Sequence, residues 1–237
     1  AYYMAVKELQ RMRSIGTSVP RFPLPPDGAL GFRLQKYGVD SWEEVFGVRQ
    51  RLTLLIYADE IRRLSTHPKW QKDAAMGELI RTLLAVTLSK MASFTSSLCV
   101  WRNVRTCVAQ TFGRQTLSMV WDFGEMNPFA ESAGDFKEGT DYLLKFIDHV
   151  LVTVDGAGQT EQANAAENPL PDDCANIVFT DPPYYDAVPY GHLSEFFLVW
   201  LHAASVISSA PKEIAERRNK ECIVDLGLGL TKSHFEK

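Results

Sequence analysis

The chain has little cysteine and no long apolar run. Only four of its 237 residues are cysteines, and none forms a CxxC pair, so the sequence predicts neither a zinc site nor a disulfide framework. Reduced thiols are then the ordinary expectation. No stretch of about 18 consecutive apolar residues occurs, which argues against a membrane span. The first thirteen residues lack the apolar segment of a signal peptide. We therefore expect a cytoplasmic protein with no membrane partner.

An excess of basic charge is also absent. The formal net charge is −4, which excludes a protein coated in basic charge for nucleic acid but leaves room for a local basic groove. Apolar residues make up 46% and charged residues 23% of the chain, as in an ordinary globular protein. The length suits one large domain, or a core with a subdomain.

Apolar residues at helical spacing predict most of the secondary structure. Ser41 and Glu44 have the spacing of a capping box, which predicts the start of a helix. Prolines and glycines between residues 19 and 32 predict an irregular connector. Residues 176–181, NIVFTD, form a short β-branched apolar run that predicts a buried parallel strand. Helices are expected over residues 1–13, 46–64, 69–94, 138–154 and 192–206.

The most distinctive stretch is FTDPPYYDAVPYGH, residues 179–192, which follows the predicted strand. Ligands of open α/β sheets bind at the carboxyl ends of strands, where this loop would lie. Pro182 and Pro183 restrict their own backbones and bias the residues before them toward extended geometry. They would hold the Asp181 carboxylate and the carbonyl of Pro182 side by side. Two such acceptors can hold both hydrogens of one NH2 group, and Tyr184 offers a flat face beside them.

This arrangement suits the exocyclic amine of a planar base. The lone pair of such an amine is delocalised into the ring, and fixed acceptors can direct it toward an electrophile by positioning and electrostatics. A paired base must first leave the duplex, and stacking on one aromatic side chain is worth about 1–3 kcal/mol. Asp186, Pro189 and Tyr190 either shape this pocket or cap the following helix. Tyr185, the second ring of the pair, is assigned with Asp186 and Tyr190 to substrate binding.

The DPPY string after a strand resembles the catalytic motif of the amino-group DNA methyltransferases, which use S-adenosylmethionine. The longer string VFTDPPYYDAVPYGHLSEFFLVWL is similar to the adenine-specific DNA methylase family that carries a DUF1156 region. GFRLQKYGVDSWEEVFGVRQRL and RQTLSMVWDFGEMNPFAES also resemble segments of that family. The resemblance covers about Gly31 to Leu201. It implies that Asp181 and Pro182 bind an adenine N6 amine in DNA and that Tyr184 stacks on the base.

The same resemblance implies an α/β fold: a partial Rossmann-like methyltransferase sheet with a large helical insert. Residues 1–40 would form a connector and N-terminal helix, residues 41–137 a helical insert that suits target recognition, and residues 138–237 the part carrying DPPY. Asn164 and Ala165 stand where the family has an acidic residue, often followed by alanine, beside the adenosine of the cofactor.

One family element has no counterpart upstream of the DPPY string. The glycine-rich turn that binds the cofactor is missing there, and the GLG at 227–229 has too little chain after it to serve. The sequence therefore suggests a fragment with a partial sheet. Such a sheet has unpaired edges, so we expect homodimer contacts through those edges or local disorder, and weak cofactor binding or none.

Several alternatives stay open. The transferred methyl group could go to the N4 of cytosine, to RNA or to an amide, or the chain could be a noncatalytic binding module of the same fold. His192 is expected to be a helix-start residue.

Two aromatic stretches also have two interpretations. Trp101, with three arginines, contacts DNA phosphates or lies on a solvated face, and the rings of WDFGEMNPF, residues 121–129, line the base pocket or belong to the core. The three arginines are Arg102, Arg105 and Arg114.

Overall fold

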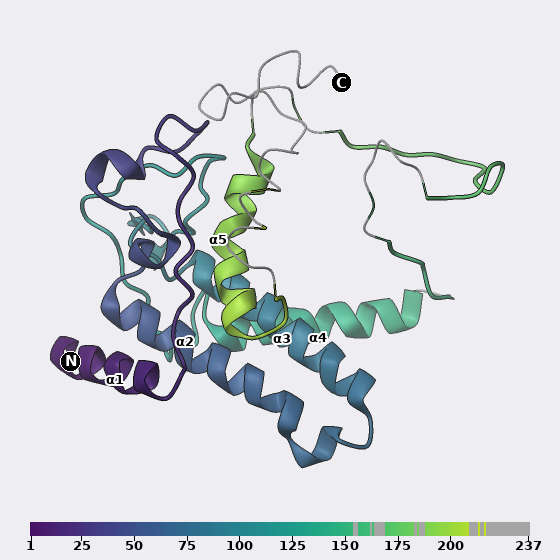
Figure 1. Ribbon diagram of the computed structural model, residues 1–237, viewed down its shortest axis with the longest axis horizontal. Helices are drawn as coiled ribbons and strands as arrows, with labels where there is room; N and C mark the ends of the chain where they lie inside the picture. The colour runs from purple at the N-terminus through teal and green to yellow at the C-terminus, as the bar shows by residue number, and fades with distance from the viewer. Residues whose placement is uncertain are drawn as a thin grey trace.

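The computed structural model describes residues 1–153, 156–161, 163, 169–182, 184, 188–208, 213 and 216, and most of them lie in helices or in the connectors between them (Figure 1). The long helices are α1 (Tyr2–Ser14), α2 (Val48–Arg63), α3 (Ala74–Ser93), α4 (Phe136–Thr153) and α5 (Tyr190–Ala203). The short 3-10 helices are η1 (Leu34–Tyr37), η2 (Trp42–Val45), η3 (Leu64–Thr66) and η4 (Pro68–Trp70). Within the described ranges the sheet is a single antiparallel pair, β1 (Trp101–Arg102) and β2 (Cys107–Val108).

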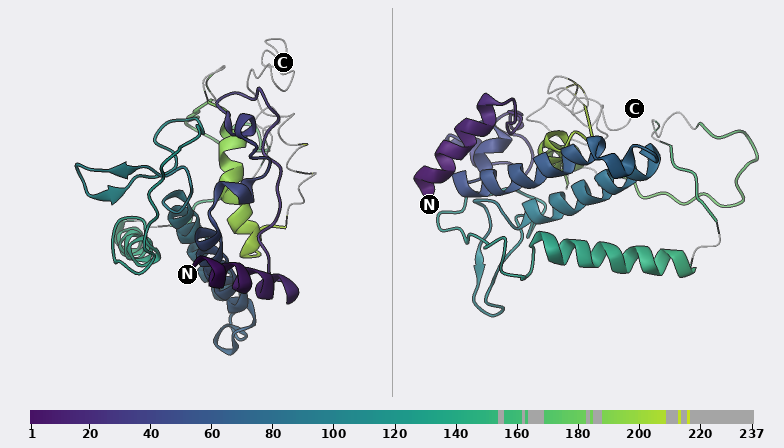
Figure 2. Two further views of the ribbon diagram at one scale, coloured as in Figure 1. Left: turned by 90° about the vertical axis from the view of Figure 1, so that its left-hand side faces the viewer. Right: turned by 90° about the horizontal axis from the view of Figure 1, so that it is seen from below.

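Helix α5 packs at the centre of the core although it comes late in the chain. It contacts both α2 and α3, while α1 lies against α2 and α4 lies along α3 (Figures 1 and 2). Three of its side chains, Phe196, Val199 and Trp200, are wholly buried. The ring of Phe46, from the turn before α2, lies 5.1 Å from Phe196 and 5.0 Å from Trp200 between ring centroids. Aromatic contacts at these distances contribute stability beyond the burial of area.

The structure confirms the expected helices and changes their ends. The long helix predicted from residue 69 begins at Ala74, because Asp73 caps it: Asp73 Oδ1 accepts a hydrogen bond from the Met76 amide at 3.0 Å. Ser41 precedes only a single 3-10 turn, η2, where Glu44 Oε2 accepts from the Ser41 amide at 3.2 Å. Gly47 is the N-cap of α2 and donates its amide to Gln50 Oε1 at 2.7 Å.

Residues 176–181 differ from the buried strand that the sequence predicts. In the described part of the chain they pair with no other strand, and they run outside the helical body (Figure 1). Their apolar side chains are strongly exposed: Ile177 is 85%, Val178 79% and Phe179 95% accessible. A strand requires a neighbour to take up its backbone hydrogen bonds, and no described segment pairs with this one as a strand.

No helix in the described ranges is long and apolar enough to cross a membrane.

Candidate nucleic-acid interface

The exposed residues Asp181, Pro182 and Tyr184 are the described part of the DPPY motif. Their side chains are available to a ligand from outside the helical body. The other motif and loop residues to which the sequence assigns roles lie outside the described residues, as do the predicted cofactor contacts and the GLG string: Pro183, Tyr185, Asp186, Asn164, Ala165 and residues 227–229.

The chain re-enters the core immediately after this motif. Val188 is buried, Pro189 is the N-cap residue of α5, and Tyr190 is its first residue. The Tyr190 amide donates to the Val188 carbonyl at 3.0 Å, and the Tyr190 ring stays partly exposed. The capping interpretation therefore holds for Pro189. Because α5 is fixed by the core, it holds one end of the motif loop against a rigid support.

Two polar side chains of α5 are buried below this entry point. The His192 ring lies 5.6 Å from the Phe32 ring, edge to face, and is 1% exposed. Glu195 Oε2 accepts a hydrogen bond from Trp42 Nε1 at 3.0 Å. His192 thus belongs to the first turn of the helix, as expected, and its burial suits packing better than contact with a base.

Phe32 connects α5 to a pair of segments that run side by side. The Leu117 amide donates to the Gly31 carbonyl at 3.0 Å, and the Arg33 amide donates to the Leu117 carbonyl at 3.4 Å. Gly31 has φ +75°, and a Cβ there would meet the Gln115 carbonyl oxygen at 3.3 Å. Glycine is therefore suited to this close approach, because other residues rarely adopt that backbone conformation.

A hollow of about 550 Å³ lies along these segments, and we call it the basic groove. Three cations and two hydroxyls line it, namely Arg33, Lys36, Arg114, Thr116 and Ser118, and no acidic side chain is among the lining residues. None of the three cations forms an ion pair with a described residue. Positive charge with hydroxyl donors and no competing carboxylate is the composition expected for a phosphate contact.

The basic groove adjoins α5. Arg114 also lines a second hollow, together with Leu193 and Ser194 from the first turns of that helix. Arg114 therefore lies near the helix that begins directly after the DPPY motif, and Phe32, which also lines the groove, contacts His192 of that helix.

An exposed aromatic pair follows the groove in the chain. Tyr37, the residue after Lys36, lies edge to face with Trp121 at 5.7 Å between ring centroids. Trp121 is 79% exposed, so it belongs to neither the core nor an enclosed base pocket. Its neighbours Phe123 and Phe129 are also exposed, while Met126 is buried. Exposed rings beside cations are typical of surfaces that stack nucleic-acid bases.

The other arginines of the predicted cluster lie on a different feature. Arg102 is in β1, and Arg105 is in the loop of the β1–β2 hairpin, which projects from the body (Figure 2). Both are exposed, as is Trp101. The structure thus separates Arg114, which lines the basic groove, from the arginines of the hairpin.

The residues around the predicted cofactor contacts enclose a large open hollow of about 1060 Å³. Carboxylates from Glu161, Asp172 and Asp173 line it together with the side chains of Leu170 and Val178. Carboxylates can accept hydrogen bonds from ribose hydroxyls, so these residues fit one part of S-adenosylmethionine. No glycine-rich turn after a strand is found in the described ranges. No cluster of described His, Cys, Asp and Glu residues could hold a metal ion.

Sequence reasoning missed most of the basic groove. Arg33 and Lys36 are three residues apart, which is unremarkable by itself, and nothing local indicates that they meet residues 114–118. Comparison of the chain with protein-family models, with curated proteins and with solved structures gives no match. The function is therefore inferred from the residues of the motif and of the groove.

Proposed function

We propose that this chain carries the base-binding part of an S-adenosylmethionine-dependent DNA methyltransferase that modifies the exocyclic N6 amine of a flipped adenine. One observation carries the proposal: an exposed Asp181-Pro182 pair with Tyr184 stands directly before a buried helix, and an unpaired basic groove adjoins that helix.

The motif residues would act by positioning. The Asp181 carboxylate and the Pro182 carbonyl accept the two amine hydrogens, and Tyr184 stacks on the base. The bound cofactor supplies an electrophilic methyl group. The new nitrogen–carbon bond would form as the sulfur–methyl bond of the cofactor breaks and S-adenosylhomocysteine leaves, and the methylated nitrogen would then be acidic enough to lose one proton to Asp181 or to water. No covalent bond to the protein is needed.

The fold proposal is a partial Rossmann-like α/β sheet with a helical insert. Residues 176–181 would be one strand of this sheet, with α4 before it and α5 after it. The exposure of Ile177, Val178 and Phe179 supports this, because burying such side chains contributes about 1.5–3 kcal/mol each. The partner strand could come from a second copy of the chain, which is the homodimer through sheet edges that we also propose.

The basic groove would hold the DNA backbone while the motif holds the base. The three cations of the groove lack ion-pair partners among the described residues: Arg33, Lys36 and Arg114. Phosphates would therefore neutralise their charge without breaking an existing ion pair. Tyr37 and Trp121 would stack on an unpaired base near the target.

Labelled S-adenosylmethionine tests the reaction. The protein, expressed in the full length that its gene encodes, is incubated with the label and unmethylated DNA, and the DNA is digested to nucleosides. We expect label in N6-methyladenosine that disappears in Asp181→Ala and persists in the control Asp27→Ala, an exposed carboxylate in the connector. Label in N4-methylcytosine, or transfer only to RNA or to protein amides, would replace the adenine assignment.

A second candidate is a nucleic-acid-binding module without catalysis. One observation favours it. The described residues include the basic groove and the aromatic pair, which suit a nucleic acid, but they include no glycine-rich turn that suits the cofactor. DNA binding without methyl transfer by the full-length protein, to any acceptor, would select this function.

A further inference from the structure

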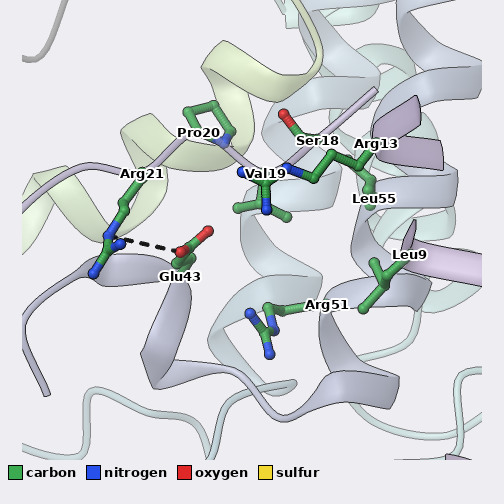
Figure 3. A pocket seen from close by; sticks show the side chains of 9 residues that line it. All are labelled: Leu9, Arg13, Ser18, Val19, Pro20, Arg21, Glu43, Arg51 and Leu55. Atoms are coloured by element: carbon green, nitrogen blue, oxygen red, sulfur yellow. Dashed lines mark ion pairs between the residues drawn. The ribbon is translucent and has the colours of Figure 1, made fainter. Parts of the chain in front are cut away.

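A separate cavity lies where α1 meets α2, and its volume is about 330 Å³ (Figure 3). It lies between the second half of α1, the chain at residues 18–21, the 3-10 helix η2 and the first half of α2. None of its lining residues belongs to the basic groove or to the DPPY motif. Cavities of about 300–1000 Å³ are the usual size for small-molecule sites.

Positive charge dominates the lining. Arg13, Arg21 and Arg51 contribute guanidinium groups, and Glu43 is the one carboxylate among the lining residues. Arg21 forms ion pairs with Glu43 at 3.9 Å and with Glu44 at 3.5 Å. The dashed line in Figure 3 marks the pair with Glu43. Arg13 and Arg51 form no ion pair with any residue that the structure describes.

Arg51 carries the strongest indication of a ligand. Its Nε is shielded from solvent and has no hydrogen-bond acceptor within the described part of the chain. A shielded donor without an acceptor is unfavourable, and the fold keeps the Arg51 Nε in this state at the fourth residue of α2. A guanidinium presents paired donors in a plane that match the oxygens of a phosphate or carboxylate.

The rest of the wall is apolar. Leu9 and Leu55 come from the two helices, and Val19 and Pro20 come from the connector above them (Figure 3). Ser18 adds one hydroxyl. A bare inorganic ion would leave these apolar surfaces uncovered, whereas an anion with a small apolar body would use both kinds of wall.

We propose that this cavity binds a small organic oxyanion, with its charged oxygens on Arg51 and Arg13 and its apolar part against Leu9, Val19 and Leu55. The site is independent of the methyltransferase assignment, because it shares no residue with the motif or the groove. Arg21, paired with Glu43 and Glu44, also lines the cavity.

Calorimetric titration with phenyl phosphate and with benzoate tests the proposal and separates the two oxyanion types. We expect the protein to bind at least one of them, and more tightly than inorganic phosphate. Arg51→Met should weaken that binding at least tenfold, and Arg51→Lys should weaken it less, because lysine keeps the charge but loses the paired donors. Arg105→Met, on the hairpin, is the control and should bind as the unchanged protein does.

Thermal unfolding gives an independent sign. Without anion, Arg51→Met should melt at or above the temperature of the unchanged protein, because it removes a buried unsatisfied donor. With phenyl phosphate or benzoate, the unchanged protein should gain more in melting temperature than Arg51→Met. Equal affinity in both proteins, or no binding of either probe at millimolar concentration, would overturn the proposal. Binding of duplex DNA that depends on Arg51 in the absence of either small anion would overturn it too, and would assign the arginine to a nucleic-acid surface.

Discussion

Two neighbouring apolar stretches of this molecule differ in solvent exposure. Residues 177–179 are apolar and exposed, whereas α5, which starts eleven residues later, buries Phe196, Val199 and Trp200 completely. A helix satisfies its backbone hydrogen bonds internally and requires only a complementary surface, which α2 and α3 provide. A strand requires another strand. Apolar composition therefore predicts what a segment can bury, and the partner decides whether it does.

The largest expected effect is on the free energy of unfolding, when one large side chain is replaced by alanine in the buried helix and one in the exposed stretch. Trp200→Ala should lower the free energy of unfolding by about 3–5 kcal/mol, because it leaves a cavity beside Phe46. At protein concentrations too low for the proposed sheet-edge dimer, Phe179→Ala should change it by less than about 0.5 kcal/mol, as for other exposed positions. Urea unfolding of both variants measures the difference. A loss above 1.5 kcal/mol, taken as a rough threshold, for Phe179→Ala would mean that residues 176–181 are buried in solution, as in a paired sheet.

The next effect concerns the basic groove, whose three cations are exposed and form no ion pair with a described residue. Replacing Arg33, Lys36 and Arg114 by alanine together should reduce the slope of log affinity for DNA against log salt by roughly 2.7, from about 0.9 for each phosphate contact. The measurement is a salt titration of DNA binding by fluorescence anisotropy. Alanine at the exposed lysines Lys7, Lys72 and Lys145 is the charge-matched control and should leave the slope nearly unchanged. An unchanged slope in the groove variant would remove the groove from the DNA interface.

A smaller effect is expected where α5 buries a polar pair. Glu195→Ala should lower the free energy of unfolding by about 1–3 kcal/mol, because it leaves the Trp42 indole donor without its acceptor. Glu195→Gln keeps an acceptor oxygen for the Trp42 indole and should lower the free energy of unfolding by less. Chemical unfolding of the two variants compares them, and an equal loss would show that the carboxylate charge, rather than the acceptor, is what matters.

The smallest effect is expected at Tyr57, which contacts the start of α4. In burial, α4 is intermediate between residues 177–179 and α5, because it packs on α3 along one side and leaves other apolar side chains exposed. Tyr57 of α2 stacks on Phe136 at its start, 4.6 Å between ring centroids. Burial and then the Asp135 carboxylate raise the pKa of Tyr57 above 10.0.

The folded state therefore keeps the phenol proton to higher pH than the unfolded chain does. The free energy of unfolding should fall as pH rises above about 10, and it should fall less in Tyr57→Phe. Urea unfolding across this range measures it, with the exposed Tyr2→Phe as the control. An equal fall in Tyr57→Phe and the unchanged protein would show that other groups cause the alkaline loss.

Local patterns were enough to predict the helices. The 3.6-residue spacing of apolar side chains identified α2, α3, α4 and α5, and the prolines identified the irregular connector. Helix starts were harder: Glu44 does bind the Ser41 amide, yet the turn that it caps is a short 3-10 helix, and Asp73 caps α3 without having been recognised.

The groove could not be predicted because it depends on contacts between distant segments. Phe32 pairs with Leu117 across more than eighty residues, and only that pairing places Arg33 beside Arg114. The predicted strand at 176–181 failed to find a partner for a related reason: β-branched residues favour a strand, but the pattern says nothing of which segment supplies the neighbour.

The most direct test of the central claim, that the DPPY loop holds an adenine amine for methylation, uses a cell whose own DNA methylation has been removed. Its whole genome presents every target sequence, so the recognition site need not be known. The full-length protein is expressed there, and nucleosides from purified DNA are quantified by mass spectrometry. We predict N6-methyladenine with the unchanged protein and none with Asp181→Ala at equal protein level. N6-methyladenine at the same level in Asp181→Ala, or none with the unchanged protein, would contradict the claim.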